Sequence, residues 1–262
     1  MTPDMIQALR SSALIGAIVR PLVVTVLLIG LWVGLGRAGR RGTRRLIPWS
    51  TVAVFLIAWV SIAWTLSVRG VLVSPANAGV LAAAIHILLP IILLAAGALA
   101  ILTRSKTIIS VVDAAPLWWL VAFQAYRITG FLFVRLWANG FLPGYFALPA
   151  GIGDTLTGIF AIGVAVSFWR QTPWARRFAY AVNIFGLADL VNAVSMGMLT
   201  AAKSPAGMSP ILVYPLSIVP TFGVPLAVIM HCLSLWQLKR RSQGSSGERR
   251  VHHDQSLRQA RA

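Results

Sequence analysis

The sequence predicts an all-helical, multi-pass membrane protein, a transmembrane helical bundle of about seven spans. Of its 262 residues, 58% are hydrophobic and only 11% are charged, whereas soluble domains carry about 25% charged residues. Apolar runs of about 20 residues, the length that a helix needs to cross a bilayer, follow one another along most of the chain. Because these runs are continuous and do not alternate with polar residues, they exclude an outer-membrane barrel.

Each predicted span is an apolar run bounded by charged or turn-forming residues. In order, the spans are 14–36, 46–67, 79–102, 116–137, 149–169, 178–200 and 212–237. The first run is too long for a signal peptide and its arginines follow it, so we predict a retained span. The last segment is polar and basic. We therefore predict two parts, a helical bundle over residues 1–238 and a disordered cytoplasmic tail over 239–262.

Basic residues divide unevenly between the two predicted faces of the membrane. Five arginines lie in 37–45, two basic residues in 103–115, three in 170–177 and seven after 238, against only Arg10, Arg69 and Lys203 on the other face. By the positive-inside rule, the N-terminus lies outside and the C-terminus in the cytoplasm. Attraction to anionic lipid at the cytoplasmic face accounts for the net charge of +17, so we expect a lipid partner and no nucleic acid.

The expected location is a bacterial plasma (inner) membrane. A single cysteine, Cys232, allows no disulfide within the chain and no cysteine-based metal cluster. A haem between His86 and His231 is excluded because their predicted depths differ by about 12 Å. A retinal pigment would need a lysine within a span, and every lysine lies in a loop or the tail. We therefore predict no cofactor and no metal, and the oligomeric state stays open.

The predicted topology can be tested with reporter fusions. Because the basic residues favour an outside N-terminus, fusions after Arg45 and after Lys239 should both report a cytoplasmic location, and one after Ala76 an external one. A cytoplasmic signal at Ala76 would contradict the order of the spans.

Ionisable and polar side chains within the spans are the candidate binding residues, because an ionisable group costs at least about 2.5–3.5 kcal/mol in hydrocarbon. They are Asp154, Asp189, Arg127, His86, Gln124, Asn192 and Arg135. Arg127 and Asp189 each lie about ten residues from the outer end of a span, which at 1.5 Å per residue places both about 15 Å deep. We therefore predict an ion pair between them near the membrane midplane, with Gln124 and Asn192 one helical turn away.

Asp154 lies on a stripe of small residues in the fifth predicted span, and Asp189 lies on a similar stripe in the sixth. The first stripe contains Gly158, Ala161 and Ala165, and the second Gly186, Ala193 and Gly197. Such stripes let helices approach closely, so both carboxylates should face protein. With its span starting at 149, Asp154 is predicted about 6 Å below the outer surface, within reach of Arg135 or His86.

The segment Gly151-Ile152-Gly153-Asp154 is similar to the G-x-G-D signature of presenilin-type and prepilin-peptidase-type intramembrane aspartyl proteases. In those families two carboxylates share one proton and activate water, and the G-x-G-D aspartate comes second in the chain. Here Asp189 follows it, and no P-A-L motif occurs near the C-terminus. The predicted depths of the two aspartates differ by about 9 Å, whereas such a dyad needs carboxyl groups about 3 Å apart.

Three longer segments carry a second resemblance, which covers roughly residues 116–238. They are GFLPGYFALPAGIGDTLTG, NIFGLADLVNAV and VPTFGVPLAVIMHCLSLWQL. Together they resemble small bacterial integral membrane proteins that carry a P-A-G-x-G-D segment and have no assigned activity. The resemblance implies a multi-pass membrane protein and transfers no activity.

These observations favour binding or transport of a small solute or a proton, which would reach a polar cluster in the outer half of the bilayer. Buried ionisable groups, small-residue faces and a last span broken by Pro220 and Pro225 are typical of such sites. One alternative is an intramembrane aspartyl hydrolase, and another is a membrane scaffold or partner subunit without a site. A cavity that reaches Asp154 or Asp189 would favour transport, carboxylates within about 5 Å of each other hydrolysis, and dry, fully paired charges a scaffold.

Overall fold

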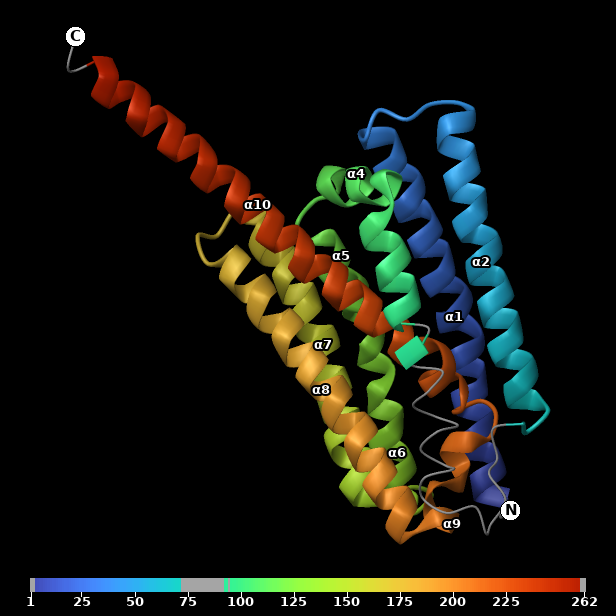
Figure 1. Ribbon diagram of the computed structural model, residues 1–262. Helices are drawn as coiled ribbons and strands as arrows, with labels where there is room; N and C mark the ends of the chain where they lie inside the picture. The colour runs from blue at the N-terminus through green and yellow to red at the C-terminus, as the bar shows by residue number, and fades with distance from the viewer. Residues whose placement is uncertain (1–2, 72–91, 94, 260–262) are drawn as a thin grey trace.

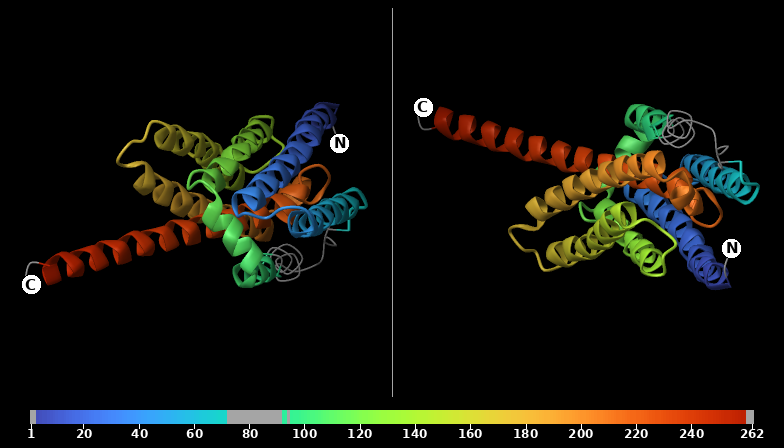
Figure 2. Two further views of the ribbon diagram at one scale, coloured as in Figure 1. Left: turned by 90° about the horizontal axis from the view of Figure 1, so that it is seen from above. Right: turned by 90° about the horizontal axis from the view of Figure 1, so that it is seen from below.

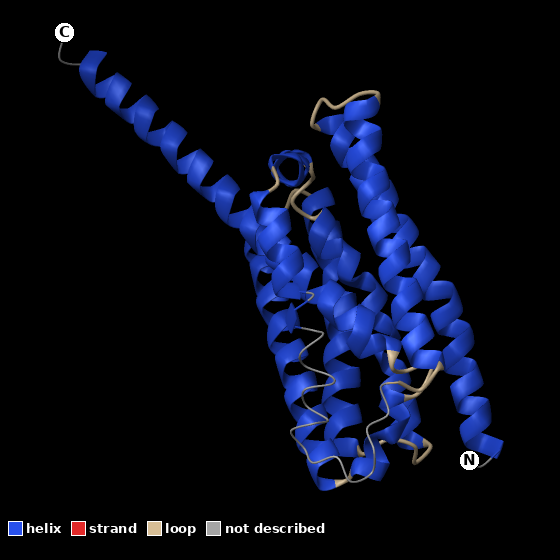
Figure 3. Ribbon diagram, turned by 45° about the vertical axis from the view of Figure 1, so that its right-hand side comes forward, coloured by secondary structure: helices blue, strands red, loops and turns tan. Residues whose placement is uncertain are grey.

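The computed structural model describes residues 3–71, 92–93 and 95–259, and this part of the chain is almost entirely helical, without strands (Figure 3). Its longest elements are α1 (Pro3–Arg37), α2 (Thr43–Val68), α7 (Gly144–Trp169), α8 (Ala175–Lys203) and α10 (Val224–Gln259). An all-helical fold is therefore confirmed for the described residues. The third predicted span, 79–102, falls largely outside them.

Within the described residues, five helices are long and apolar enough to cross a membrane, or six if a bent pair counts as one span. The bent pair is Ala95–Arg104 followed by α4 (Lys106–Ala114), at an angle of 86°. Large apolar side chains cover the outside of the long helices, with Ile18 at 70% and Val191 at 67% exposure. Continuous exposed apolar surface on this scale suits lipid better than water. The count of seven spans and the orientation stay predictions.

The fourth predicted span, 116–137, coincides with a helical stretch made of three short elements. These are α5 (Trp119–Ala122), the 3₁₀ segment η1 (Phe123–Gly130) and α6 (Phe131–Ala138). Runs of 3₁₀ helix longer than three or four residues are uncommon and often mark a functional or strained position. This segment carries the arginine on which the candidate site is centred.

The helices form two groups with α10 running between them (Figure 1). On one flank α1 and α2 lie side by side, joined where the Trp49 indole donates to the Leu28 carbonyl (2.9 Å) and Arg45 stacks on the Trp32 ring. On the other flank α7 and α8 pack together, and η1 packs against α7. The two views along the bundle in Figure 2 show the same grouping, with the distal part of α10 projecting away. The elements η1, α7, α8 and α10, which carry the buried polar residues described below, thus lie next to one another.

Helix α7 begins at Gly144, five residues before the start predicted at 149. Pro143 is the N-cap residue, and Pro149 lies inside the helix. Five residues correspond to about 7.5 Å of rise, so Asp154 lies deeper in the bundle than the sequence suggested. This shift changes its partner, as described below.

The last span begins at Val219, later than the predicted 212, with a five-residue π-helical segment η3 (Val219–Gly223) that continues into α10. Pro225 has no backbone N–H, so it cannot donate the usual helical hydrogen bond to the carbonyl of Thr221, one turn earlier. The indole of Trp59 on α2 donates to this carbonyl at 3.0 Å. The proline-broken start of the helix is thereby fastened to α2.

At the opposite end of the bundle, α4 is held against α10 by polar contacts. The Gln237 amide donates to the Val112 and Ala115 carbonyls at 2.6 and 2.7 Å, and the Arg240 guanidinium forms a two-fold contact with the Asp113 carboxylate. Beyond this junction α10 continues to Gln259, through the region predicted to be a disordered tail. The sequence after Pro225 contains no proline, so nothing there forces the helix to end. The boundary at 238 stays a prediction.

Candidate functional site

The candidate site is centred on Arg127, which η1 brings to the inside of the bundle. Side chains three residues apart eclipse one another in a 3₁₀ helix, so Gln124, Arg127 and Gly130 share one face. These three are the buried residues of η1. Glycines at positions 151 and 158 of α7 allow η1 to approach closely, because a Cβ on Gly158 would lie 2.5 Å from the backbone nitrogen of Ile128. The close contact with α7 thus aims the guanidinium at the residues of α7 and α8.

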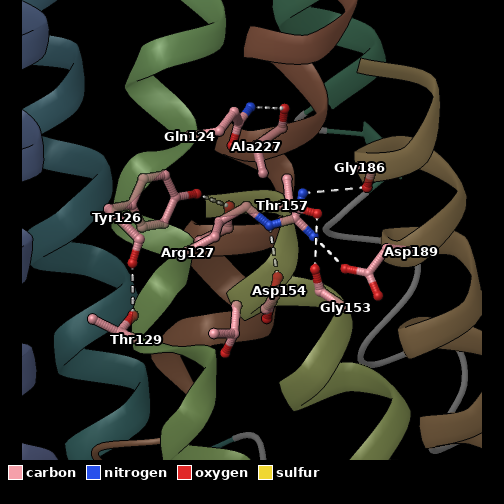
Figure 4. A network of polar contacts seen from close by, with 12 residues as sticks. Gln124, Tyr126, Arg127, Thr129, Gly153, Asp154, Thr157, Gly186, Asp189 and Ala227 are labelled. Atoms are coloured by element: carbon pink, nitrogen blue, oxygen red, sulfur yellow. Dashed lines mark hydrogen bonds and ion pairs between the residues drawn. The ribbon is translucent and has the colours of Figure 1, made fainter. Parts of the chain in front are cut away.

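Two carboxylates bind the same side of this guanidinium (Figure 4). Arg127 Nε donates to Asp154 Oδ1 at 2.6 Å, and Nη2 donates to Asp189 Oδ2 at 2.5 Å. The Arg127 and Asp189 side chains are nearly inaccessible, whereas the Asp154 side chain is 18% exposed. The ion pair predicted between Arg127 and Asp189 is present, and Asp154 adds a second carboxylate to it.

The remaining nitrogen of the guanidinium contacts α8 and α10. Nη1 donates to the Gly186 carbonyl (3.2 Å) and lies 3.0 Å from His231 Nε2. Since a guanidinium only donates, His231 Nε2 must be the acceptor, and its ring proton is on Nδ1. Nδ1 then donates to Asn183 Oδ1 (2.9 Å), whose amide nitrogen donates to Ser234 Oγ (3.0 Å). With one ring nitrogen accepting and the other donating, His231 is neutral. These hydrogen bonds also fix the orientation of its ring beside Arg127.

Glycines supply the room in which this cluster packs. A Cβ on Gly153 would overlap Asp189 Oδ1, one on Gly130 would overlap the Asp154 side chain, and one on Gly186 would overlap the His231 ring. Of the small-residue stripes predicted on α7 and α8, Gly158, Ala161 and Gly186 face protein, because Gly158 lies against η1, Ala161 is buried and Gly186 lies against His231. Their role is to admit charged side chains as well as to bring the backbones together.

A cavity of about 150 Å³ lies next to the cluster, among α1, η1, α6, η3 and the start of α10. Asp154 and Arg127 line it on one side and Arg20 of α1 on another, while most other lining residues are apolar. The α1 residues that line it are numbered 15–23, in the half of the candidate span Ala13–Arg37 nearer the N-terminus. Arg127 and Asp154 are thus the charged members of the cluster that line this space, and Asp154 is the more exposed of the two.

The charges of the cluster do not cancel. One guanidinium contacts two carboxylates, and the neutral His231 adds no charge, so the ionised cluster carries a net charge of −1. Asp154 Oδ1 is engaged by Arg127, while Oδ2 has no hydrogen-bond partner within the described part of the chain. An excess negative charge in a low-dielectric interior favours uptake of a proton or of a cationic group.

Of the other predicted site residues, the three that the structure describes lie apart from this cluster. Asp154 pairs with Arg127, so the prediction of Arg135 as its partner was wrong. Arg135 and Asn192 are both exposed. The earlier start of α7 places Asp154 deeper than Arg135. Gln124 is fully buried, but its amide donates to the Ala227 carbonyl (3.1 Å) and not to the ion pair. His86 lies outside the described residues.

Two members of the cluster, His231 and Asn183, were not among the predicted site residues. The sequence shows both within spans, but a last span starting at 212 places His231 about 19 residues from its outer end. With the start at Val219 the separation falls to about 12 residues, which moves the histidine by about 10 Å toward the arginine. A correct helix start would have found it.

A family described as a domain of unknown function, DUF8737, matches residues 82–239, more than half of the chain. The chain belongs to this family. The matched region contains all members of the Arg127 cluster and excludes α1 and α2. The comparisons with curated proteins and with solved structures each found no match. Membership of the DUF8737 family agrees with the resemblance to proteins without an assigned activity and adds no reaction or ligand.

Proposed function

We propose that the Arg127 cluster is a membrane-embedded binding site for a small solute or a proton, which reaches Asp154 through the adjoining cavity. The observation that carries this proposal is the cavity of about 150 Å³ that Asp154 lines. Because Arg127 also pairs with Asp189, Asp154 can bind or release a ligand or a proton while the Arg127–Asp189 ion pair stays intact. A site of this kind suits binding, and it suits transport if the cavity opens alternately to the two faces.

The position of the protein in a cell belongs to the same proposal. We infer a bacterial plasma membrane, with the N-terminus outside and the basic C-terminal region near anionic lipid in the cytoplasm. In this orientation the cavity, which is lined by the N-terminal half of the candidate span Ala13–Arg37, lies in the outer half of the bilayer.

The two alternatives receive less support. An aspartyl hydrolase needs two carboxyl groups that share one proton, whereas here each carboxylate binds a different nitrogen of one guanidinium, and no hydrogen bond joins the two carboxyl groups within the described residues. A scaffold without a site would pair all of its buried charges, as Arg127 and Asp189 do. The partly exposed Asp154 with an unbonded oxygen beside a cavity is the feature that a purely structural role does not require.

Thermal melting of the purified protein against a library of metabolites tests the proposal. A ligand at 100 times its Kd should raise Tm by about 5–10 °C, and Asp154→Asn should abolish the rise. Asp113→Asn is the matched control, because Asp113 is 40% exposed on α4 and far from the cavity lining, so this variant should keep the rise. A proton would instead appear as a pH-dependent infrared band of a protonated carboxyl group that Asp154→Asn removes. No stabilising compound and no such band would contradict the proposal.

A further inference from the structure

The cavity beside Asp154 has a second charged group on its wall, Arg20 of α1. The Arg20 guanidinium lies 5.5 Å from the centre of the Tyr214 ring and folds back against Gly16. Among the described residues it has no ion pair or hydrogen bond, and the aromatic face is the partner recorded for it. A guanidinium has five N–H donors, so most of the binding capacity of Arg20 is unused.

Asp154 offers the complementary group on the same cavity. Its Oδ2 has no hydrogen-bond partner in the described part of the chain, and it belongs to a cluster with a net charge of −1. Arg20 contributes +1, so the cavity as a whole is neutral but has its two charges at separate places. Each unpaired charge in an apolar environment is costly.

The rest of the lining sets the size and character of a ligand. Apolar side chains make up most of the wall, among them Val19, Leu132, Ile218 and Phe222. An apolar cavity of about 150 Å³ accommodates a body the size of benzene. The wall therefore suits a short aliphatic or aromatic group and not a sugar or a nucleotide.

We propose that the ligand of this cavity is a small zwitterion with a protonated amine that binds Asp154 and an acid group that binds Arg20. This inference rests on the proposed function and specifies its ligand. A molecule with both groups pairs both charges of the wall and adds no net charge to the interior. A molecule with only one of them leaves the other charge unpaired, which gives the site its selectivity. Arg20 lies outside the region matched to the DUF8737 family, so α1 completes the site.

Three matched probes test this chemistry by thermal melting in detergent. Leucine carries both groups, 3-methylbutylamine lacks only the acid, and 4-methylpentanoate lacks only the amine. Saturating leucine should raise Tm by about 5–10 °C, and each truncated probe by much less. Arg20→Gln should reduce the leucine shift to that of the amine. Arg20 is only partly buried and forms no ion pair with the residues that the structure describes, so this variant should fold. Arg135→Gln, which changes an exposed arginine outside the cavity, should keep the full leucine shift.

The outcomes separate this inference from the proposed function. If 4-methylpentanoate stabilises as well as leucine, if Arg20→Gln leaves the leucine shift unchanged, or if only singly charged or neutral library compounds stabilise, the zwitterion inference is overturned and the binding site stands. If no compound stabilises and no protonated carboxyl band appears, both fail.

The same pair of groups also occurs in the headgroup of phosphatidylethanolamine, and nanodiscs distinguish the two sources. A leucine shift in phosphatidylcholine nanodiscs supports a free solute. A higher Tm in phosphatidylethanolamine than in phosphatidylcholine nanodiscs, lost in Arg20→Gln and in Asp154→Asn, supports a lipid headgroup. A shift in neither experiment overturns the inference.

Discussion

Replacing Arg127 with alanine is expected to lower the free energy of unfolding by about 3–5 kcal/mol and Tm by roughly 10 °C or more. The loss is large because one side chain pairs two carboxylates, Asp154 and Asp189, at 2.6 and 2.5 Å. Without the guanidinium, both carboxylates and the His231 ring lose a partner inside the bundle. Thermal melting in detergent measures the change.

The matched control is Arg135→Ala, which removes the next arginine along the chain. Arg135 is exposed, so its loss should change stability by no more than about 0.5 kcal/mol. A double-mutant cycle then isolates the pair. Because Asp189→Ala removes one of the charges that Arg127→Ala strands, the double variant should lose much less than the sum of the single losses. Strictly additive losses would show that the two side chains do not interact.

The class of fold and the central ion pair could be predicted from the sequence. The first follows from the length of the apolar runs, and the second from the number of residues between each charged residue and the end of its span. Long apolar runs can satisfy their backbone groups in lipid only as helices or closed barrels, and these runs lack the alternation of barrel strands. Counting helix rise from the span ends placed Arg127 and Asp189 at one depth. The predicted span ends were wrong by a few residues, but the arginine side chain is long enough to reach Asp189 despite this difference in depth.

The rest of the cluster could not be predicted, because it depends on where two helices begin. Pro149 and the residues near 212 look like helix starts in the sequence, but α7 begins at Gly144 and the last span at Val219. The first shift brings Asp154 to Arg127, and the second brings His231. Neither start has a local signal strong enough to override a proline nearby.

The 3₁₀ geometry of η1 has its origin in tertiary packing. The segment contains no proline, and its one glycine is the last residue, Gly130, so its local sequence does not predict eight residues of 3₁₀ helix. The departure coincides with the close contact against Gly151 and Gly158 of α7. It also aligns Gln124, Arg127 and Gly130 on one buried face, whereas at 3.6 residues per turn the first and the last of these would lie about 120° apart around the helix.

Gly153→Ala is expected to cost about 1–3 kcal/mol, the usual range for adding volume to a well-packed interior. Its Cβ would occupy the position of Asp189 Oδ1, so the carboxylate must turn away from Arg127 or α8 must move. Both responses weaken the ion pair. Gly197→Ala on α8 is the matched control, because its Cβ would make ordinary contacts of 3.4 and 3.5 Å with the Phe146 ring. This control should be close to neutral or slightly stabilising, since alanine restricts the unfolded chain.

Combining the glycine substitution with the arginine substitution identifies the cause of its effect. If Gly153→Ala acts by displacing Asp189 from Arg127, its cost should fall sharply in the Arg127→Ala background, where that contact is already lost. If it acts only by separating α7 from α8, its cost should be the same in both backgrounds. Melting of the four proteins in one detergent gives the answer. An equal cost would assign Gly153 to helix packing alone and would contradict the view that this glycine admits the Asp189 carboxylate.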